Sequence, residues 1–302
     1  MKKGGNAEGI IILVVIIVAL IISSLGKGGS GQEGGERSNT QSRNESVTSR
    51  EAPNEIEVSL SLGNASRAYQ SFEEYIVVNN RGREPINITG WYLKNAKDRR
   101  PYNIGGELRY FVSDIAYIGK ATPFLSPSGN NIMLDIILDR GERAIITTGN
   151  IAVQTPYKIV SFKENICSGY LENMEEYNFT PSLSRDCPRP SEESGLDRLD
   201  VECRKFVERL SSCRTPEFDT RDEDGSICRN CVNGTPLSNA CVAYIKERFS
   251  YAGCIAHHVN DEDFYGDTWR IFLSRGWEMW AEEYETIEIF DRFGRLISSR
   301  SY

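Results

Sequence analysis

The amino-acid sequence predicts a mainly β protein, in which an antiparallel β-sandwich carries a small disulfide-rich helical insertion and follows one N-terminal transmembrane helix. Three observations lead to this fold class. A run of thirteen apolar residues, 10–22, stands near the start of the chain, and short alternating or apolar segments separated by turn residues begin after residue 55. All eight cysteines fall between residues 167 and 254. These patterns are typical of a membrane helix, of β-strands and of a disulfide framework.

The chain is acidic, which excludes one class of partner. Its 302 residues include 35 Lys and Arg against 43 Asp and Glu, a formal net charge of -8. Nucleic-acid binding requires clustered cationic side chains that neutralise phosphates. The longest basic run, 97–100, contains Asp98. We therefore expect no nucleic-acid partner.

The apolar run near the N-terminus predicts a single membrane pass. Residues 9–25 contain no charged side chain, and a helix of that length spans about 25 Å, close to the thickness of a bilayer core. Lys2 and Lys3 precede the run, so the positive-inside rule places residues 1–8 in the cytoplasm and the bulk of the chain outside. The expected location is the cell membrane, with the membrane itself as a partner through this helix. A cleaved secretory signal is the alternative, and it also delivers the remaining chain outside the cytoplasm.

The Gly/Ser-rich segment 26–54 predicts a flexible linker. It contains no aromatic residue and only one β-branched aliphatic residue, Val47. It therefore cannot bury enough apolar surface to offset the entropy of ordering. A flexible coil of this length reaches about 30 Å, which is enough to hold a folded domain away from a membrane.

Short segments with β-type patterns follow the linker. Residues 56–60 alternate between apolar and polar, and the apolar run 75–78 ends at the turn-forming sequence 79–82. The other candidate strands are 87–93, 110–118, 132–138, 143–148, 269–273, 286–290 and 296–302. Nine short strands suit a sandwich of two antiparallel sheets.

Several of these segments carry a family resemblance. Residues 74–80, EYIVVNN, and 84–93, EPINITGWYL, resemble the opening strands of the lamin-tail (lamin Ig-like) domain. Residues 139–146, DRGERAII, are similar to that family's turn and following strand, with Arg140 where proline is common. Residues 291–302 resemble its closing strand.

The resemblance implies an Ig-like sandwich of lamin-tail type, of the kind found in membrane-anchored or secreted prokaryotic proteins. It covers 55–165 as the first part of the sandwich and 266–302 as the closing strands, with a cysteine-rich insertion, 166–265, between them. Trp91 is then expected to plug the core after the Gly-Trp turn. Trp277, Met279, Trp280 and Tyr284 are expected to join the core or to form a loop that covers it.

The cysteines predict disulfide bonds. They are Cys167, Cys187, Cys203, Cys213, Cys228, Cys231, Cys241 and Cys254. An even number in an oxidising compartment indicates four disulfides that stabilise a region with a small core. Spacing does not select the pairing, but the simplest guess joins Cys167 to Cys187. The segments 199–213 and 237–254 form a weak repeat, and each predicts one short amphipathic helix, the two being cross-linked into a helical cap.

Two residue groups allow a chemical alternative. Cys228 and Cys231 have the C-x-x-C spacing of redox and zinc sites, and with Cys254 and His257 they are candidate metal ligands. Pro236 lies shortly after this pair and disfavours the helix that a redox site requires. Histidines 257 and 258 are adjacent, and adjacent side chains on a strand point in opposite directions. We therefore prefer structural disulfides and expect no cofactor.

Three common motifs of hydrolases and nucleotide-binding enzymes are absent. The sequence contains no G-x-S-x-G, H-E-x-x-H or G-x-x-x-x-G-K pattern. We therefore predict no catalytic residues and no enzymatic activity.

The N-x-S/T sequons mark candidate glycosylation sites if the host glycosylates its surface proteins. The candidates are Asn44, Asn64, Asn178 and Asn233. Asn44 lies in the predicted linker and is the most accessible of them. A fifth sequon, at Asn87, lies in a predicted strand.

These inferences predict a membrane-anchored, extracytoplasmic protein that acts as a non-enzymatic interaction or adhesion module. Its partner would be an unidentified surface protein or a glycan. Two alternatives remain open: a metal-binding or thiol-active surface protein, and an accessory domain that presents substrate to a surface hydrolase.

Overall fold

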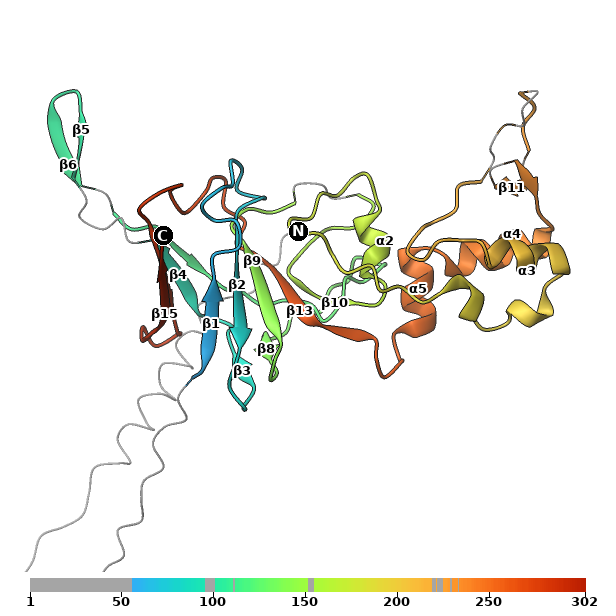
Figure 1. The fold of residues 1–302 in the computed structure, drawn as a ribbon, viewed down its shortest axis with the longest axis horizontal. Helices are drawn as coiled ribbons and strands as arrows, with labels where there is room; N and C mark the ends of the chain where they lie inside the picture. Colours follow the sequence, from blue (N-terminus) through green and yellow to red (C-terminus); the bar gives the residue numbers. More distant parts are fainter. Residues whose placement is uncertain are drawn as a thin grey trace, which may run out of the picture. The chain divides into compact units, whose positions relative to one another are not determined.

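The computed structural model describes residues 56–95, 101–110, 112–151, 155–218, 221, 225–228, 230–232 and 234–302. It confirms a mainly β fold with several antiparallel sheets and a small disulfide-linked helical region (Figure 1). The predicted cytoplasmic residues 1–8, transmembrane helix 9–25 and linker 26–54 lie outside the described residues. Within the described ranges, none of the helices combines the length and apolar character that a membrane crossing requires.

The larger sheet has five strands. Their order across the sheet is β1 (Val58–Ser61), β2 (Tyr75–Asn80), β9 (Arg143–Thr147), β13 (Tyr265–Phe272) and β10 (Phe162–Asn165). Neighbours are antiparallel except β9 and β13, which run parallel with Ala144 opposite Trp269. The expectation of a wholly antiparallel sandwich is therefore wrong at this pair. A parallel pair needs a long crossover, and the chain between these strands supplies one because it contains the whole cysteine-rich region.

The second sheet has four antiparallel strands, and the described residues also form three pairs of short strands. The order is β15 (Leu296–Ser301), β14 (Thr286–Phe290), β4 (Tyr92–Asn95) and β7 (Ile115–Tyr117). The pairs are β3 (Ile86–Asn87) with β8 (Ile137–Leu138), β5 (Pro101–Ile104) with β6 (Glu107–Tyr110), and β11 (Cys231–Val232) with β12 (Thr235–Pro236). The predicted strand 87–93 is thus divided between β3 and β4, because Gly90 adopts a positive φ of 82° in a turn between them.

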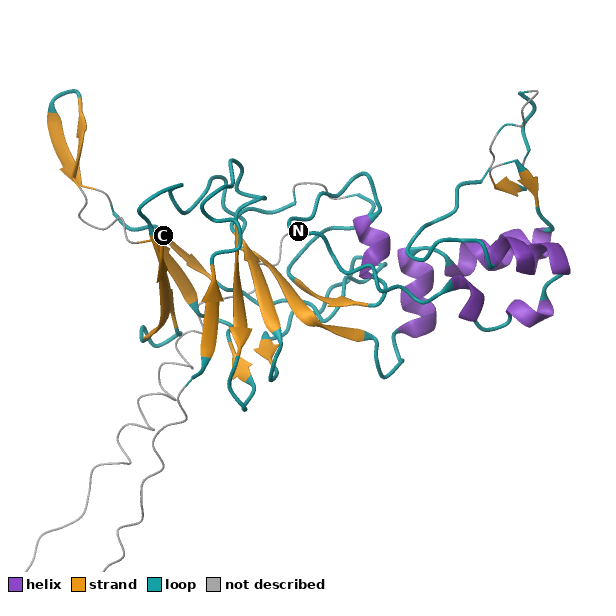
Figure 2. Cartoon of the chain, viewed as in Figure 1, coloured by secondary structure: helices purple, strands orange, loops and turns teal. Residues whose placement is uncertain are grey.

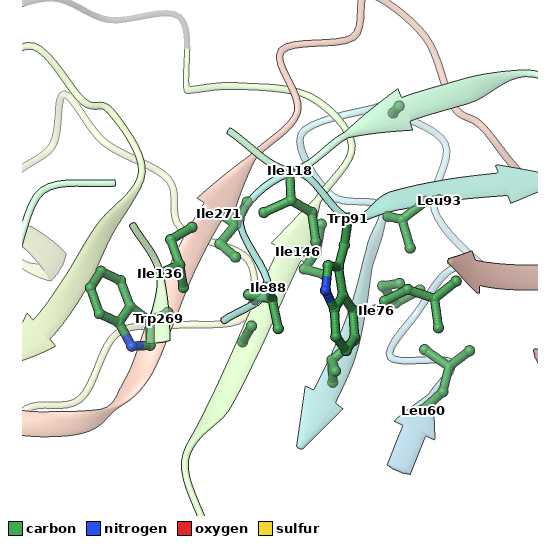
Figure 3. Packing of buried hydrophobic residues seen from close by; sticks show 14 of the residues in the cluster. Leu60, Ile76, Ile88, Trp91, Leu93, Ile118, Ile136, Ile146, Trp269 and Ile271 are labelled. Atoms are coloured by element: carbon green, nitrogen blue, oxygen red, sulfur yellow. The ribbon is translucent and has the colours of Figure 1, made fainter. Parts of the chain in front are cut away.

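Both larger sheets contribute side chains to one hydrophobic core. Ile76 comes from β2 and Leu93 from β4, and both are fully buried. Trp91 is only 2% exposed, and Figure 3 shows its indole among the core isoleucines. The Gly90 and Ile118 amides fix its backbone, because Gly90 N–H donates to Ile118 O and Ile118 N–H donates to Trp91 O, both at 2.8 Å. The predicted core position of Trp91 is confirmed.

A buried carboxylate fixes the loop that closes this core. Both oxygens of Glu74 accept backbone hydrogen bonds, from Met279 N at 2.8 Å and Trp280 N at 3.1 Å. Burial raises the pKa of Glu74 above its usual value. These bonds direct the Met279 and Trp280 side chains into the core, as expected. Trp277, in contrast, is 67% exposed, so this part of the aromatic cluster is not core.

The helical region lies beyond β13 and β10, on the side of the sheet away from β1 (Figures 1 and 2). Its elements are α2 (Ser168–Glu172), η1 (Pro190–Glu192), η2 (Leu196–Arg198), α3 (Val201–Val207), α4 (Asn239–Arg248) and α5 (Tyr251–His258). Asp200, Ser238 and Ser250 cap α3, α4 and α5, each accepting a backbone N–H bond. The second repeat unit therefore forms two helices rather than the predicted one, because Ser250 starts a new helix after Arg248.

Four disulfides join the cysteines of this region. The pairs are Cys167–Cys254, Cys187–Cys213, Cys203–Cys241 and Cys228–Cys231. The guess that Cys167 bonds Cys187 is wrong, because α5 packs in the same hydrophobic cluster as Cys167 and brings Cys254 to it. The third pair links α3 to α4, as the repeat predicted. Four disulfides indicate an oxidising, extracytoplasmic location.

Gly169→Ala is expected to lower the free energy of unfolding by about 1 to 3 kcal/mol, as overpacking does in a filled core. A Cβ atom at this position would collide with Cys213 Sγ and would lie 2.9 Å from Cys187 Sγ. Chemical denaturation of the oxidised protein measures the change. Gly276→Ala is the control, because a Cβ there meets no atom within 4 Å. Equal stability of the two variants would show that the Cys187–Cys213 disulfide does not pack closely against α2.

Candidate interaction surfaces

The hairpin of β5 and β6 is the clearest candidate for contact with a partner. Gly105 and Gly106 form its turn with positive φ angles of 61° and 88°, and Asn103 Oδ1 accepts a hydrogen bond from Gly106 N at 2.9 Å. A two-residue turn of this kind matches the twist of antiparallel strands. The two strands form a sheet of their own and join neither of the larger sheets.

The hairpin exposes large apolar side chains on both of its faces. Leu108 and Tyr110 are two positions apart on β6, so their side chains lie on the same face of the hairpin. Ile104 pairs with Glu107, which alternates with them, so its side chain lies on the other face. Leu108 is 62% exposed, Tyr110 60% and Ile104 57%. None of them belongs to the three hydrophobic clusters of the described residues. Exposed apolar groups of this size are typical of an interaction surface.

A row of apolar side chains crosses the outer face of the four-stranded sheet. Leu296, Phe290, Tyr92 and Tyr117 lie opposite one another on successive strands. The Phe290 and Tyr92 rings stack with centroids 4.9 Å apart, and Tyr92 and Tyr117 are tilted at 5.4 Å. Such cross-strand pairs stabilise the sheet. Tyr117, which is 66% exposed on the edge strand β7, is the part of the row most open to a partner.

A cleft of about 600 Å³ lies between residues 56–57, the segment 82–87 that follows β2, and the turn after β14. Its lining includes Trp91, Phe293, Arg83 and Arg295. Asp291 organises the adjoining turn. Burial raises the pKa of this carboxyl, but hydrogen bonds from the backbone of Arg295 and Phe293, together with the Arg295 guanidinium at 3.1 Å, hold the pKa below its usual value. Because the lining carries charges of both signs, it favours no single class of ligand.

The candidate metal ligands are not brought together. Cys228 and Cys231 are bonded to each other, and Cys254 is bonded to Cys167, so none of the three provides a thiolate. His257 lies on α5, where its Nε2 is 3.3 Å from Glu247 Oε1. In the part of the chain that the structure describes, no group of three or more His, Cys, Asp or Glu side chains could hold a metal ion.

His258, which also lies on α5 rather than on a strand, connects three segments of the helical region. Its Nδ1 is 2.7 Å from Asp261 Oδ2, and its Nε2 is 2.9 Å from Glu193 Oε1. The other oxygen of Glu193 is 3.6 Å from Arg248 Nη1 on α4. Burial lowers the pKa of His258. The hydrogen bonds with Asp261 and Glu193, together with the negative charges of these two residues, raise the pKa by more than burial lowers it, so the pKa lies above its usual value.

The candidate glycosylation sites differ in accessibility. Asn178 is exposed. Asn64 is half-buried, and its Oδ1 accepts a hydrogen bond from Tyr75 N at 3.2 Å. Asn44 and Asn233 lie outside the described residues. Asn87 is exposed, and its Nδ2 donates to Asp135 Oδ2 at 3.0 Å.

No protein-family model matches this sequence, and no curated protein is significantly similar to it. The strand patterns in the sequence did not predict the hairpin of β5 and β6. Its signal is the Gly-Gly pair at 105–106 between two short segments that mix apolar and polar residues.

His258→Gln is expected to lower the free energy of unfolding mainly at mildly acidic pH. Because the pKa of His258 is higher in the folded protein than in the unfolded chain, its stabilising effect is complete below the unfolded pKa, about 6.5. The effect is lost as the pH rises through the folded pKa. We expect a difference of about 1.5 to 3 kcal/mol near pH 5.5, which is typical of hydrogen bonds to charged groups. Urea denaturation at a series of pH values measures it.

His257→Gln is the control for this experiment. It removes the neighbouring ring on the same helix, which contacts the exposed Glu247 instead of a buried carboxylate. If the difference in the free energy of unfolding between His258→Gln and the native protein did not change with pH, the stabilising role of protonated His258 would be contradicted.

Proposed function

We propose that this chain is a membrane-anchored, extracytoplasmic interaction or adhesion module without enzymatic activity. Its rigid part is a sandwich of lamin-tail type, closed by residues 266–302 after the cysteine-rich insertion 166–265. Residues 9–25 hold it in the membrane as a single pass, and the linker 26–54 separates it from the surface. The partner is a surface protein or a glycan.

The arrangement of the strands supports the lamin-tail interpretation. The two segments with the family's opening pattern contain β2 and the stretch from β3 to β4, and Trp91 is buried between the sheets. The closing segment contains β15, which pairs with β14. β10 and β13 are paired with Asn165 opposite Tyr265, so the insertion leaves and returns at one edge of the five-stranded sheet. An insertion with adjacent ends is compatible with an intact sandwich.

The exposed apolar hairpin carries the interaction function. A two-stranded hairpin is marginally stable on its own in water, and the apolar side chains of this one belong to none of the hydrophobic clusters that the described residues form. Burial against a partner would remove Ile104, Leu108 and Tyr110 from water, and tyrosine is frequent among residues that dominate binding energy.

Replacing these three side chains by serine is expected to abolish adhesion while leaving the fold intact. Beads that carry the purified full-length protein would be passed over isolated envelopes of the producing cells, and the retained fraction counted. We expect the Ile104→Ser, Leu108→Ser, Tyr110→Ser variant to be retained at least about tenfold less than the native protein, since each anchor contributes more than about 1 kcal/mol.

The control changes exposed apolar residues elsewhere, Val201→Ser and Ile132→Ser, which are 51% and 71% exposed. Near-ultraviolet circular dichroism verifies that all variants remain folded. Protease treatment of the envelope would abolish retention by a protein partner, and periodate treatment would abolish retention by a glycan. Equal retention of the hairpin variant and the native protein would exclude the hairpin as the adhesive element.

A further inference from the structure

The Cys228–Cys231 disulfide differs from the other three in its surroundings. Six of the eight cysteines belong to two hydrophobic clusters of the helical region, and each of the six is at most 7% exposed. Cys231 is also buried. Cys228 alone is partly exposed, next to Ile227, which is 64% exposed. Since thiol–disulfide exchange requires a thiolate to reach a sulfur atom, Cys228 Sγ offers the most accessible point of attack.

This disulfide also contributes the least to stability by its position in the chain. It joins residues separated by 3 positions, whereas the others span 26, 38 and 87. The stabilisation that a disulfide provides by restricting the unfolded chain grows with the length of the loop it closes. Of the four disulfides, Cys228–Cys231 is therefore the one whose presence is least explained by stability.

The backbone around the pair is held by other contacts. Cys231 lies opposite Pro236 and Val232 opposite Thr235 in the short hairpin of β11 and β12. Leu237 N–H donates to Asn230 O at 2.8 Å, and Asn230 Nδ2 donates to Asn239 Oδ1, at the start of α4, at 2.6 Å. The sulfur–sulfur bond can therefore open and re-form without loss of the surrounding turn.

We propose that Cys228–Cys231 is a site of thiol–disulfide exchange, a stoichiometric reaction whose substrate is a protein or peptide dithiol and which adds to the adhesive role without making the protein a catalyst. A substrate thiolate attacks Cys228 Sγ and the bond to Cys231 breaks. Its electron pair goes to Cys231 Sγ, which takes up a proton. The second substrate thiolate then attacks the substrate sulfur of the mixed disulfide and releases Cys228 as a thiolate. The substrate is oxidised to a disulfide, and the cysteine pair is reduced to two thiols.

The reverse half-reaction provides the test, because removal of one sulfur traps the intermediate. In full-length Cys231→Ser, the Cys228 thiolate is expected to attack an oxidised two-cysteine peptide, break its disulfide and remain in a mixed disulfide. In full-length Cys228→Ser, the remaining Cys231 thiol is buried, and we expect about tenfold less adduct. Mass spectrometry measures both. Equal adduct in the two variants would overturn the assignment of Cys228 as the attacked sulfur.

The native full-length protein gives an independent result that does not depend on the folding of a variant. It would be treated with increasing concentrations of a reduced two-cysteine peptide, quenched with a maleimide and mapped by peptide mass spectrometry. We expect Cys228 and Cys231 to be labelled first, with one oxidised peptide formed per reduced pair, while Cys203 and Cys241 stay bonded at about tenfold higher peptide concentration. Simultaneous or earlier opening of another pair, or no opening of this one, would overturn the proposal.

Discussion

Both larger sheets depend on the return of the chain from the cysteine-rich region. β13 pairs with β9 and β10 in one sheet, and β14 is the central partner of β4 in the other. Neither sheet can close until the chain has passed through the helical region and come back. The Cys167–Cys254 bond shortens this excursion, since it joins residues 87 positions apart close to its two ends. By the chain-entropy estimate, such a bond stabilises the folded state by about 4.5 kcal/mol.

A polar contact complements this covalent link. Glu164 on β10 and Arg270 on β13 form an ion pair in which both side chains are at most 6% exposed. Arg270 also donates to Pro181 O at 2.7 Å and to Ser182 O at 2.6 Å, so one guanidinium fastens the insertion to the sheet. Loss of one partner would leave a buried charge, at a cost of about 3 to 5 kcal/mol. The pair therefore fixes where the insertion attaches more than it adds to net stability.

The parts of the fold that the sequence predicted are those with a local signal. The alternation of 286–290 matches β14, and the even number of cysteines predicted four disulfides. β10 was missed because its sequence, FKEN, has no apolar alternation. Its Glu164 is buried only because Arg270 lies beside it, and no local pattern reveals a partner so distant in the chain. The guess that Cys167 bonds Cys187 failed for the same reason, because the true partner, Cys254, is set by the packing of α5.

The two candidate sites share a physical property, which is that they lie outside the clusters that hold the fold. The residues of the β5–β6 hairpin and the Cys228–Cys231 pair appear in none of the three hydrophobic clusters. Because stability is supplied elsewhere, by the core around Trp91 and by three buried disulfides, these elements can expose apolar surface or an accessible sulfur at little cost. Among the residues that the structure describes, no hydrophobic cluster includes the hairpin side chains, which is why the hairpin was proposed as the contact with a partner. The sulfur pair lies at the separate hairpin of β11 and β12, so mutations can test the proposed contact and the proposed exchange independently.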